Sequence, residues 1–438
     1  MAQDLNRKLV VDGLLKVEKS GFSNLVLPSL LSDGRLSPQD KGFISNLFYG
    51  TIERKITLDF ILSRFISKPL KKLDGEVLAI MRSGLYQILY MNSVPSFAAI
   101  NQAVSLCSSF KKTSAKGLVN AVLRKAADFD INTARFSSET ERMSILYSVS
   151  REIVEIIMKD YPDTYEEIIK GMLITPSLTV NINTTKITAE DFKALLDEKG
   201  VSYKDTPLEN CLEITQGGAV TNLPGFDRGY FFVQGLTSRY AISTAGIKKG
   251  DNVLDLCAAP GGKTFAAAIY LDNTGTITSC DPNPSRLVLI ENGAKRLGFT
   301  NITTLENLGQ NYREDLGGKD IIICDVPCSG IGIIPKKPDL RYKKLDDIDR
   351  LCALQQEILS TAAKYVKTGG RIVYSTCTIN KAENQNQITE FLSKNENFRL
   401  VKQACPVPGA ENDNNMVTFL PHTTKCDGFF IAVLEKVW

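Results

Sequence analysis

The sequence contains a single histidine, His422, and its ten cysteines include no C-x-x-C pair. Zinc sites and disulfide frameworks depend on clustered cysteines and histidines, so we expect neither a bound metal nor disulfide bonds. No run of 18 apolar residues occurs, and Asp4 and Arg7 interrupt the N-terminal segment where a signal peptide needs an apolar core. These absences predict a reduced, cytoplasmic protein that does not contact a membrane.

The chain also lacks a strong charge of either sign. Its formal net charge is +3 over 438 residues, so any affinity for nucleic acid must come from local basic clusters and not from a global field. The length is too great for one compact core, and the composition, 43% hydrophobic and 23% charged, is that of a globular protein. We expect a multidomain protein that is a monomer.

Three parts follow one another along the chain. Residues 1–130 are predicted to be all-helical, because apolar residues recur at helical spacing in Leu9–Val17, Phe43–Ile52, Ile56–Phe65, Val77–Met91 and Ala98–Phe110. Residues 131–235 begin with a polar connector (131–150) and a helical stretch (151–174). A small α+β unit resembling an RNA-recognition fold follows, with strands at Leu178–Ile182, Cys211–Ile214 and Tyr230–Val233 and a helix at Ala189–Glu198.

Residues 236–438 alternate strands and helices. Expected strands are Asn252–Leu256, Thr276–Cys280, Ile302–Leu305, Ile321–Cys324 and Arg371–Tyr374, and expected helices are Lys263–Tyr270, Ser285–Leu297 and Leu351–Val366. This rhythm predicts a doubly wound, Rossmann-like α/β domain with a mostly parallel sheet. Such sheets bind ligands at the carboxyl ends of their strands, and the motifs below all fall there.

The first motif is the loop 255–264, D-L-C-A-A-P-G-G-K-T, which joins a strand to a helix. Its glycines allow a tight turn and a close backbone approach to a ligand at the helix N-terminus. Its tail Gly262-Lys263-Thr264 fits a phosphate-binding P-loop, but Cys257 stands where the first glycine is required, which disfavours that interpretation, and the dinucleotide pattern G-x-G-x-x-G is absent. Asp281 follows the next strand, where an acid either accepts hydrogen bonds from ribose hydroxyls or caps the following helix.

Two cysteines lie at strand ends of the same domain. Cys328 belongs to the P-C motif Asp325-Val326-Pro327-Cys328, and Cys377 to the T-C motif Thr376-Cys377. A thiolate is a good nucleophile and a good leaving group, which suits covalent activation of a poorly nucleophilic ring carbon. A cysteine is more often a small buried hydrophobe, and we interpret five others in that way: Cys107, Cys211, Cys280, Cys352 and Cys405.

Over residues 230–438 the chain resembles the Sun/NOL1/NOP2 family of RNA cytosine-5 methyltransferases. The resemblance rests on loop 255–264, both cysteine motifs, and the segments 232–234, 338–341, 355–356, 383–384 and 427–432. It implies that S-adenosylmethionine is the cofactor, held by Cys257, Ala258, Ala259, Pro260, Gly261, Gly262, Lys263, Asp281, Asn307 and Asp325. The family has an acid where this chain has Glu306-Asn307.

The resemblance also implies the reaction. Cys377 would attack carbon 6 of a cytosine, forming a covalent adduct from which carbon 5 is methylated, and Cys328 would assist release of the product. Lys263 and Asp325 would orient the base and the cofactor. DNA cytosine-5 methyltransferases attack with the P-C cysteine, so the presence of both motifs favours an RNA substrate.

The N-terminal domain resembles the antitermination factor NusB in Ala99–Val104 and Gly117–Arg124. This combination implies an enzyme acting on small-subunit (16S) ribosomal RNA. The basic segment Lys336–Lys344 is predicted to contact phosphates, with Tyr342 stacking on an unpaired base, and a second basic cluster comprises Lys111, Lys112, Lys116, Arg124 and Lys125. The alternatives are a cytosine-5 methyltransferase acting on tRNA or DNA, a non-enzymatic RNA-binding regulator, and a P-loop nucleotidase.

Overall fold

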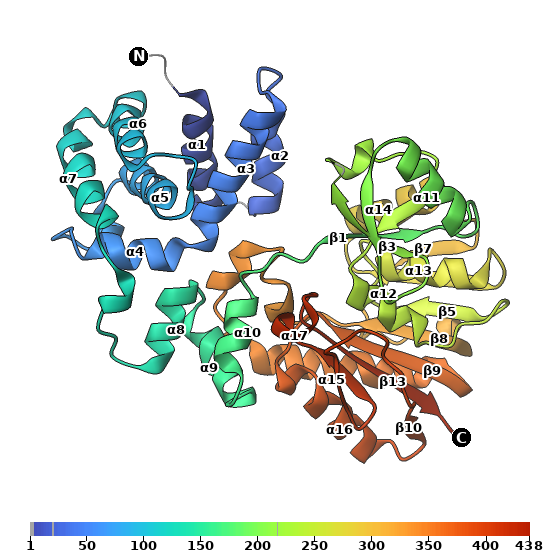
Figure 1. The fold of residues 1–438 in the computed structure, drawn as a ribbon. Helices are drawn as coiled ribbons and strands as arrows, with labels where there is room; N and C mark the ends of the chain where they lie inside the picture. Colours follow the sequence, from blue (N-terminus) through green and yellow to red (C-terminus); the bar gives the residue numbers. More distant parts are fainter. Residues whose placement is uncertain (1–3, 20–21, 217) are drawn as a thin grey trace. The chain divides into compact units, whose positions relative to one another are not determined.

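The computed structural model describes residues 4–19, 22–216 and 218–438. The chain divides into two compact units (Figure 1). One, the helical unit, comprises Met1–Leu173 and Lys336–Lys344; the other, the sheet unit, comprises Ile174–Pro335 and Leu345–Trp438. Within the described ranges, every helix is too short or too polar to cross a membrane.

The helical unit is all-α, as the spacing of its apolar residues predicts. Its α-helices are α1 (Leu5–Lys19), α2 (Ser23–Leu31), α3 (Pro38–Glu53), α4 (Lys55–Ser63), α5 (Gly75–Tyr90), α6 (Ser96–Ser109), α7 (Lys116–Ala127), α8 (Glu139–Tyr147), α9 (Arg151–Asp160) and α10 (Tyr165–Gly171). Helix α8 falls within the predicted connector 131–150, so that interpretation was wrong for residues 139–147. Its sequence is largely polar because only Met143, Ser144 and Ile145 are buried.

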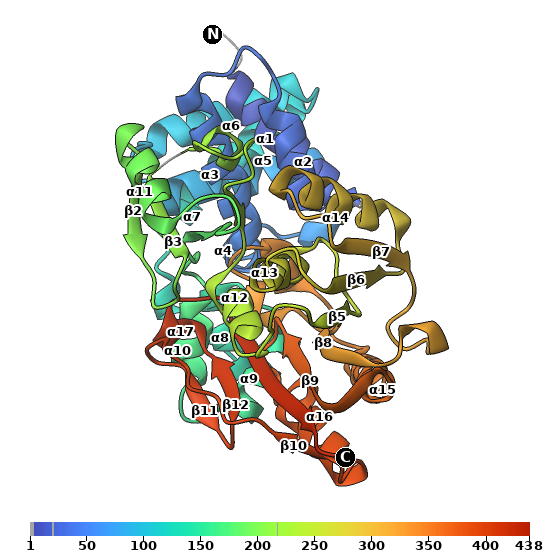
Figure 2. The ribbon, with the colours of Figure 1, turned by 90° about the vertical axis from the view of Figure 1, so that its right-hand side faces the viewer.

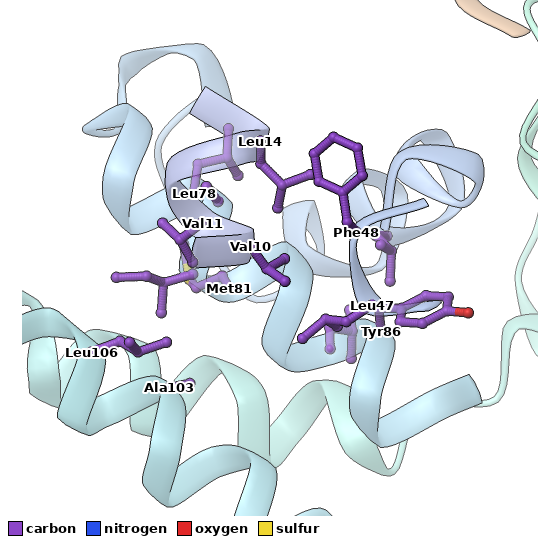
Figure 3. Packing of buried hydrophobic residues seen from close by; sticks show 14 of the residues in the cluster. Val10, Val11, Leu14, Leu47, Phe48, Leu78, Met81, Tyr86, Ala103 and Leu106 are labelled. Atoms are coloured by element: carbon purple, nitrogen blue, oxygen red, sulfur yellow. The ribbon is translucent and has the colours of Figure 1, made fainter. Parts of the chain in front are cut away.

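Helix α5 forms the centre of the helical unit. Every residue from Val77 to Gln87 is buried, which is the pattern of a helix surrounded by other helices. Side chains of α1, α3, α5 and α6 meet in this core, among them Val10, Phe48, Met81 and Leu106 (Figure 3). Helix α3 begins with a capping box, in which Ser37 and Asp40 satisfy each other's backbone N–H groups.

Segment Lys336–Lys344, which we call the docked segment, belongs to the helical unit although it lies far along the chain. Asp339 accepts hydrogen bonds from the backbone N–H and the hydroxyl of Ser23. The guanidinium of Arg341 is fully buried and donates to the backbone oxygens of Met172 (2.5 Å) and Tyr147 (3.3 Å). The docked segment is therefore an integral part of the helical unit.

The sheet unit begins with a small antiparallel sheet of order β2-β3-β1-β4. Its strands are β1 (Leu178–Ile182), β2 (Ser202–Asp205), β3 (Cys211–Gln216) and β4 (Phe231–Val233), covered by α11 (Ala189–Glu198). The Thr188 side chain caps α11 by accepting from the backbone N–H of Asp191. The predicted α+β subdomain is confirmed, and β2 is added to the strands expected from the sequence.

The large sheet has the order β11-β12-β13-β9-β8-β5-β6-β7, with β10 beside β13. Figure 2 shows β7, β6, β5, β8 and β9 side by side. These five pair in parallel, whereas β10 to β13 pair antiparallel. The sheet is therefore mixed, and the predicted parallel part is its first half. The strands are β5 (Asn252–Asp255), β6 (Thr276–Asp281), β7 (Ile302–Glu306), β8 (Lys319–Asp325), β9 (Val366–Thr376), β10 (Phe398–Leu400), β11 (Glu411–Asp413), β12 (Met416–Phe419) and β13 (Phe429–Lys436).

Both faces of this sheet are buried. Successive residues of β8, such as Ile321 and Ile322, enter separate core clusters because successive side chains of a strand point to opposite faces. The helices of the unit are α12 (Leu236–Ser243), α13 (Gly262–Leu271), α14 (Pro284–Leu297), α15 (Ile348–Tyr365), α16 (Gln385–Lys394) and α17 (Pro421–Thr424). The carboxyl ends of β5, β6, β8 and β9 deliver Asp255, Asp281, Asp325 and Cys377 to one edge.

Candidate active site

The predicted cofactor loop lies between β5 and α13. The hydrogen bonds that hold its backbone include those from the N–H of Ala258 to the oxygen of Cys280 (2.8 Å) and from the N–H of Gly261 to the oxygen of Ala258 (2.7 Å). Gly261 has a φ of 107°, which a side chain rarely tolerates, and it precedes the first residue of α13. The loop is therefore shaped to expose the N-terminus of α13.

Asp255 at the end of β5 is fully buried beneath this loop. One carboxylate oxygen, Oδ2, accepts a hydrogen bond from Thr264 (2.8 Å), whose hydroxyl also lies 3.0 Å from that of Ser279. Burial raises the pKa of Asp255 to about 7. The other oxygen, Oδ1, is buried without a hydrogen-bond partner among the described residues.

A pocket of about 210 Å³ opens over this loop. Seven of its lining residues were predicted from the sequence: Cys257, Ala258, Ala259, Pro260, Gly262, Lys263 and Asp325. Four more come from the structure: Val233, Gln234, Ser238 and Asp255. The segment Phe232-Val233-Gln234 carried the resemblance, but no sequence pattern marks Gln234 as a pocket residue, because it directly follows β4 in the separate, smaller sheet.

Two buried acceptor atoms of the pocket are open to a hydrogen-bond donor on a ligand. Gln234 Oε1, like Asp255 Oδ1, is buried and has no partner among the described residues. Two such acceptors lining one pocket fit an ammonium group, which brings three donors. The α-ammonium of S-adenosylmethionine is a group of this kind.

Three of the predicted cofactor residues, Gly261, Asp281 and Asn307, are not among those that line the pocket. Asp281 forms an ion pair with Arg286 (2.9 Å), which also donates to the backbone oxygen of Ala259 (2.7 Å). Asp281 is thereby tied to the cofactor loop. Asn307 is half-buried after β7, and its amide donates to the backbone oxygens of Leu308 and Asn311.

Lys263 and Asp325 form an ion pair, with 2.7 Å between Nζ and Oδ2. The Lys263 side chain is only 8% exposed, and its ammonium lies 5.1 Å from the centre of the Phe429 ring. Asp325 Oδ1 accepts a hydrogen bond from Ser375 (2.8 Å). The pair therefore presents a carboxylate of fixed orientation at the edge of the pocket.

The two cysteines predicted to act in catalysis meet in the structure. Cys328 Sγ and Cys377 Sγ lie 3.3 Å apart, and both side chains are half-buried. The hydrogen bond with Cys377 and burial raise the pKa of Cys328 well above its ordinary value. Cys328 is therefore held as a thiol beside the sulfur of Cys377.

The other cysteines and the basic segments depart in part from expectation. Cys107, Cys211 and Cys280 are buried, as predicted, whereas Cys352 and Cys405 are only half-buried. Tyr342 does not present its ring for stacking, because the ring packs against the core of the helical unit and its hydroxyl donates to the backbone oxygen of Ile52 and accepts from the N–H of Lys55 (3.2 Å). The stacking prediction was wrong, since the sequence does not show that the docked segment packs into the helical unit.

The basic residues are distributed differently in the two clusters. Lys337 and Lys344 are exposed at the two ends of the docked segment. In the second cluster, Lys112 is engaged in ion pairs with Asp74 (3.1 Å) and Glu76 (3.6 Å), whereas Arg124 and Lys125 are exposed on α7. Exposed lysines and arginines of this kind can still contact phosphates.

Comparison with known proteins agrees with this architecture. Residues 4–128 match the NusB family, residues 153–221 the ferredoxin-like domain of RsmF/B-like methyltransferases, and residues 244–435 the family described as 16S rRNA methyltransferase RsmB/F. The predicted fold class, with a NusB-like helical domain, a small α+β subdomain and an α/β methyltransferase domain, is confirmed.

Relatives align over nearly the whole chain. The probable ribosomal RNA small subunit methyltransferase B of Bacillus subtilis is 32% identical, and the alignment covers 98% of each protein. The ribosomal RNA small subunit methyltransferase B of Escherichia coli K12 is 30% identical, again over 98% of each. The solved structure of the protein PH0851 covers 99% of this chain and 98% of its own with a TM-score of 0.84 at 24% identity, so it shows the same fold.

Proposed function

Because the chain belongs to the RsmB/F family of 16S rRNA methyltransferases, we propose that it methylates carbon 5 of a cytosine in 16S ribosomal RNA through a covalent adduct. The observation that carries this proposal is the cysteine pair at the carboxyl edge of the sheet, with 3.3 Å between its sulfurs. A methyltransferase acting on a ring nitrogen or a hydroxyl has no need of two thiols. Ribosomal RNA as the substrate places the proposed activity in the cytoplasm.

The cofactor predicted from the sequence, S-adenosylmethionine, is that of this methyltransferase family, and the prediction is confirmed. When bound, it supplies an electrophilic methyl group. We assign its binding to the loop residues 257–263 together with Asp281, Asn307 and Asp325. The unpartnered oxygens of Asp255 and Gln234 support this placement, because they suit its ammonium group.

Cys377 is assigned as the nucleophile. Its thiolate adds to carbon 6 of cytosine, so that a sulfur–carbon bond forms and the electron pair of the C5=C6 double bond becomes available at carbon 5. That pair would bond to the methyl group, and the electron pair of the methyl–sulfur bond would stay with the cofactor, which would leave as a neutral thioether. A base then removes the proton from carbon 5, the double bond re-forms, and the bond between Cys377 and carbon 6 breaks. Overall, carbon 5 of the cytosine exchanges one proton for one methyl group.

Cys328 is assigned as the base that permits release. While Cys377 is a thiolate, the hydrogen bond between the two sulfurs keeps Cys328 protonated and its pKa high. Once Cys377 is bonded to carbon 6, this cause of the raised pKa is removed and Cys328 can lose its proton to water. It then takes the proton from carbon 5, which restores a thiol at 328 and a thiolate at 377.

Lys263 and Asp325 are assigned to the target base. The Asp325 carboxylate accepts a hydrogen bond from the exocyclic amine of cytosine, and the ion pair with Lys263 fixes its direction. The target must be unpaired or extruded from its helix, because carbon 6 is inaccessible within a base stack. The exposed lysines Lys337 and Lys344 are assigned to RNA phosphates.

Identification of the methylated nucleoside tests this proposal. Purified protein is incubated with 16S ribosomal RNA and methyl-labelled S-adenosylmethionine, and the RNA is digested to nucleosides for mass spectrometry. We expect the label in 5-methylcytidine. Label confined to another nucleoside, such as a methylated adenosine or an N4-methylcytidine, would overturn the assignment of carbon 5.

A further inference from the structure

Glu383 is a fully buried carboxylate close to the cysteine pair. It ends a short 3₁₀ helix, Lys381–Glu383, that follows the T-C motif. Four neutral donors converge on it. Oε1 accepts from the hydroxyl of Ser329 (2.5 Å) and the amide of Asn380 (3.1 Å), and Oε2 accepts from the backbone N–H of Ser329 (2.7 Å) and the amide of Gln355 (3.1 Å).

These bonds fix the P-C motif on both sides of Cys328. Ser329, which follows Cys328, gives Glu383 both its N–H and its hydroxyl. Gln355 on α15 bonds Glu383 and also donates to the backbone oxygen of Pro327, which precedes Cys328 (2.9 Å). The position of the Cys328 thiol therefore depends on the carboxylate of Glu383.

The nucleophile is held by strand β9 and by a backbone hydrogen bond that does not involve Glu383. Cys377 directly follows β9, and its backbone oxygen accepts from the N–H of Gly332 (3.0 Å). The T-C loop meets the Glu383 network through Thr378, whose hydroxyl lies 2.8 Å from that of Ser329. Loss of the Glu383 carboxylate would therefore release the P-C motif more than it releases Cys377.

From this geometry we propose that Glu383 is a positioning residue that holds Cys328 against Cys377 for the release step. The inference rests on the proposed function and adds a residue that positions one of the two cysteines. Glu383 does not touch the substrate; it acts through Cys328.

A carboxylate suits this position better than an amide. All four partners donate hydrogen bonds, and a glutamine would turn its own NH₂ donor toward two of them. A buried charge is costly unless it is well bonded, so its four donors also make Glu383 rigid. Its negative charge is in addition one of the causes that raise the pKa of Cys328, after the bond with Cys377 and burial.

The experiment compares adduct release in Glu383→Gln, Cys328→Ala and wild type. Full-length proteins are mixed with 16S ribosomal RNA and S-adenosylmethionine in a single turnover, and the protein–RNA species stable to denaturing electrophoresis is followed over time. We expect Glu383→Gln to transfer the methyl group but to release the RNA about ten- to a hundredfold more slowly than wild type, because a bonded buried charge is lost. Glu390→Gln, an exposed glutamate on α16, is the matched control and should release normally.

The double variant Cys328→Ala/Glu383→Gln separates positioning from a general structural role. If Glu383 acts through Cys328, its loss adds nothing once Cys328 is absent, and the double variant decays like Cys328→Ala alone. Independent, multiplying effects would overturn the proposal. Equal release by Glu383→Gln and wild type would also overturn it.

Ser329→Ala covers the case in which Glu383→Gln folds poorly. It removes one of the four donors and leaves the carboxylate, so release should slow in the same direction by a smaller factor. Wild-type release in Ser329→Ala, with Glu383→Gln unfolded, would count against the inference. The proposed function fails in a different way. If Cys328→Ala forms no adduct that depends on Cys377, the proposed mechanism is wrong. If Cys328→Ala forms the adduct but Glu383→Gln and Ser329→Ala do not, only the role of Glu383 is refuted.

Discussion

The sulfur atoms of Cys328 and Cys377 lie 3.3 Å apart, although the two residues are 49 positions apart in the sequence. The distance is too long for a disulfide bond and short enough for a thiol to bond a thiolate. Two parallel strands, β8 and β9, bring them together, because the loops after both strands open at the same edge of the sheet. The two thiols are therefore hydrogen-bonded to each other, and the bond with Cys377 raises the pKa of Cys328.

Alkylation of Cys328 should depend on Cys377. The bond with Cys377 is the largest cause of the raised pKa of Cys328, so replacing Cys377 by alanine should lower that pKa and increase the thiolate fraction. Each unit by which the pKa falls raises the thiolate fraction at neutral pH about tenfold, and it raises the reaction rate by a smaller factor because a less basic thiolate is a weaker nucleophile. Iodoacetamide labelling followed by peptide mass spectrometry measures this, with the fully buried Cys107 as an unreactive reference. The same labelling rate in both proteins would show that the bond with Cys377 does not raise the pKa of Cys328.

Binding of S-adenosylmethionine should depend on Asp281. Loss of a charged hydrogen-bond acceptor toward a ligand costs about 1.5–3 kcal/mol, so Asp281→Asn should weaken binding about ten- to a hundredfold. Isothermal titration of the purified variant measures the affinity. Asp272→Asn, which also breaks an ion pair of this domain (with Lys249, 2.6 Å), is the control and should bind normally. Unchanged affinity in Asp281→Asn would remove Asp281 from the cofactor site.

The free energy of unfolding of the ligand-free protein should depend on pH through the titration of Asp255. Its folded pKa of about 7 exceeds the ordinary value of 3.8, so the neutral acid favours the folded state. This contribution is complete below pH about 4 and is lost as the pH rises through about 7, by up to about 4 kcal/mol. Urea denaturation of wild type and Asp255→Asn from pH 4 to pH 8 should therefore give a difference that falls with pH. A difference independent of pH would contradict the raised pKa.

The docked segment should contribute to the stability of the helical unit. Arg341→Met leaves the backbone oxygens of Tyr147 and Met172 without their donor in a buried place, at a cost of about 2–5 kcal/mol. Thermal unfolding should show a clear fall in the midpoint. Lys337→Met, an exposed change in the same segment, should leave the midpoint unchanged. Equal midpoints for Arg341→Met and wild type would mean that the docking is not a stabilising contact.

Local patterns predicted a large part of this fold. Helix α11 and strand β1 have the bounds expected from their sequences, because each has an apolar face of clear period and breaking residues at its ends. The strand–loop–helix order likewise placed Asp255, Asp325 and Cys377 at one edge of the sheet. Those residues were found because topology alone brings strand ends together.

The rest depends on contacts between distant segments. In β13, residues 429–434 are all buried, so their sequence lacks the alternation of apolar and polar residues that identifies a strand. The partners of Arg341 and Tyr342 are backbone oxygens, which no sequence pattern marks. Glu383 was visible only as part of a family signature, since its four donors come from three separate segments.

Covalent trapping by single-cysteine variants tests the division of labour between Cys377 and Cys328 most directly. Each variant is incubated with 16S ribosomal RNA and S-adenosylmethionine and analysed by denaturing electrophoresis. We predict that Cys328→Ala accumulates a protein–RNA band, that Cys377→Ala forms none, and that the double variant forms none. Trapping by Cys377→Ala and none by Cys328→Ala would contradict the account, because Cys328 would then be the nucleophile.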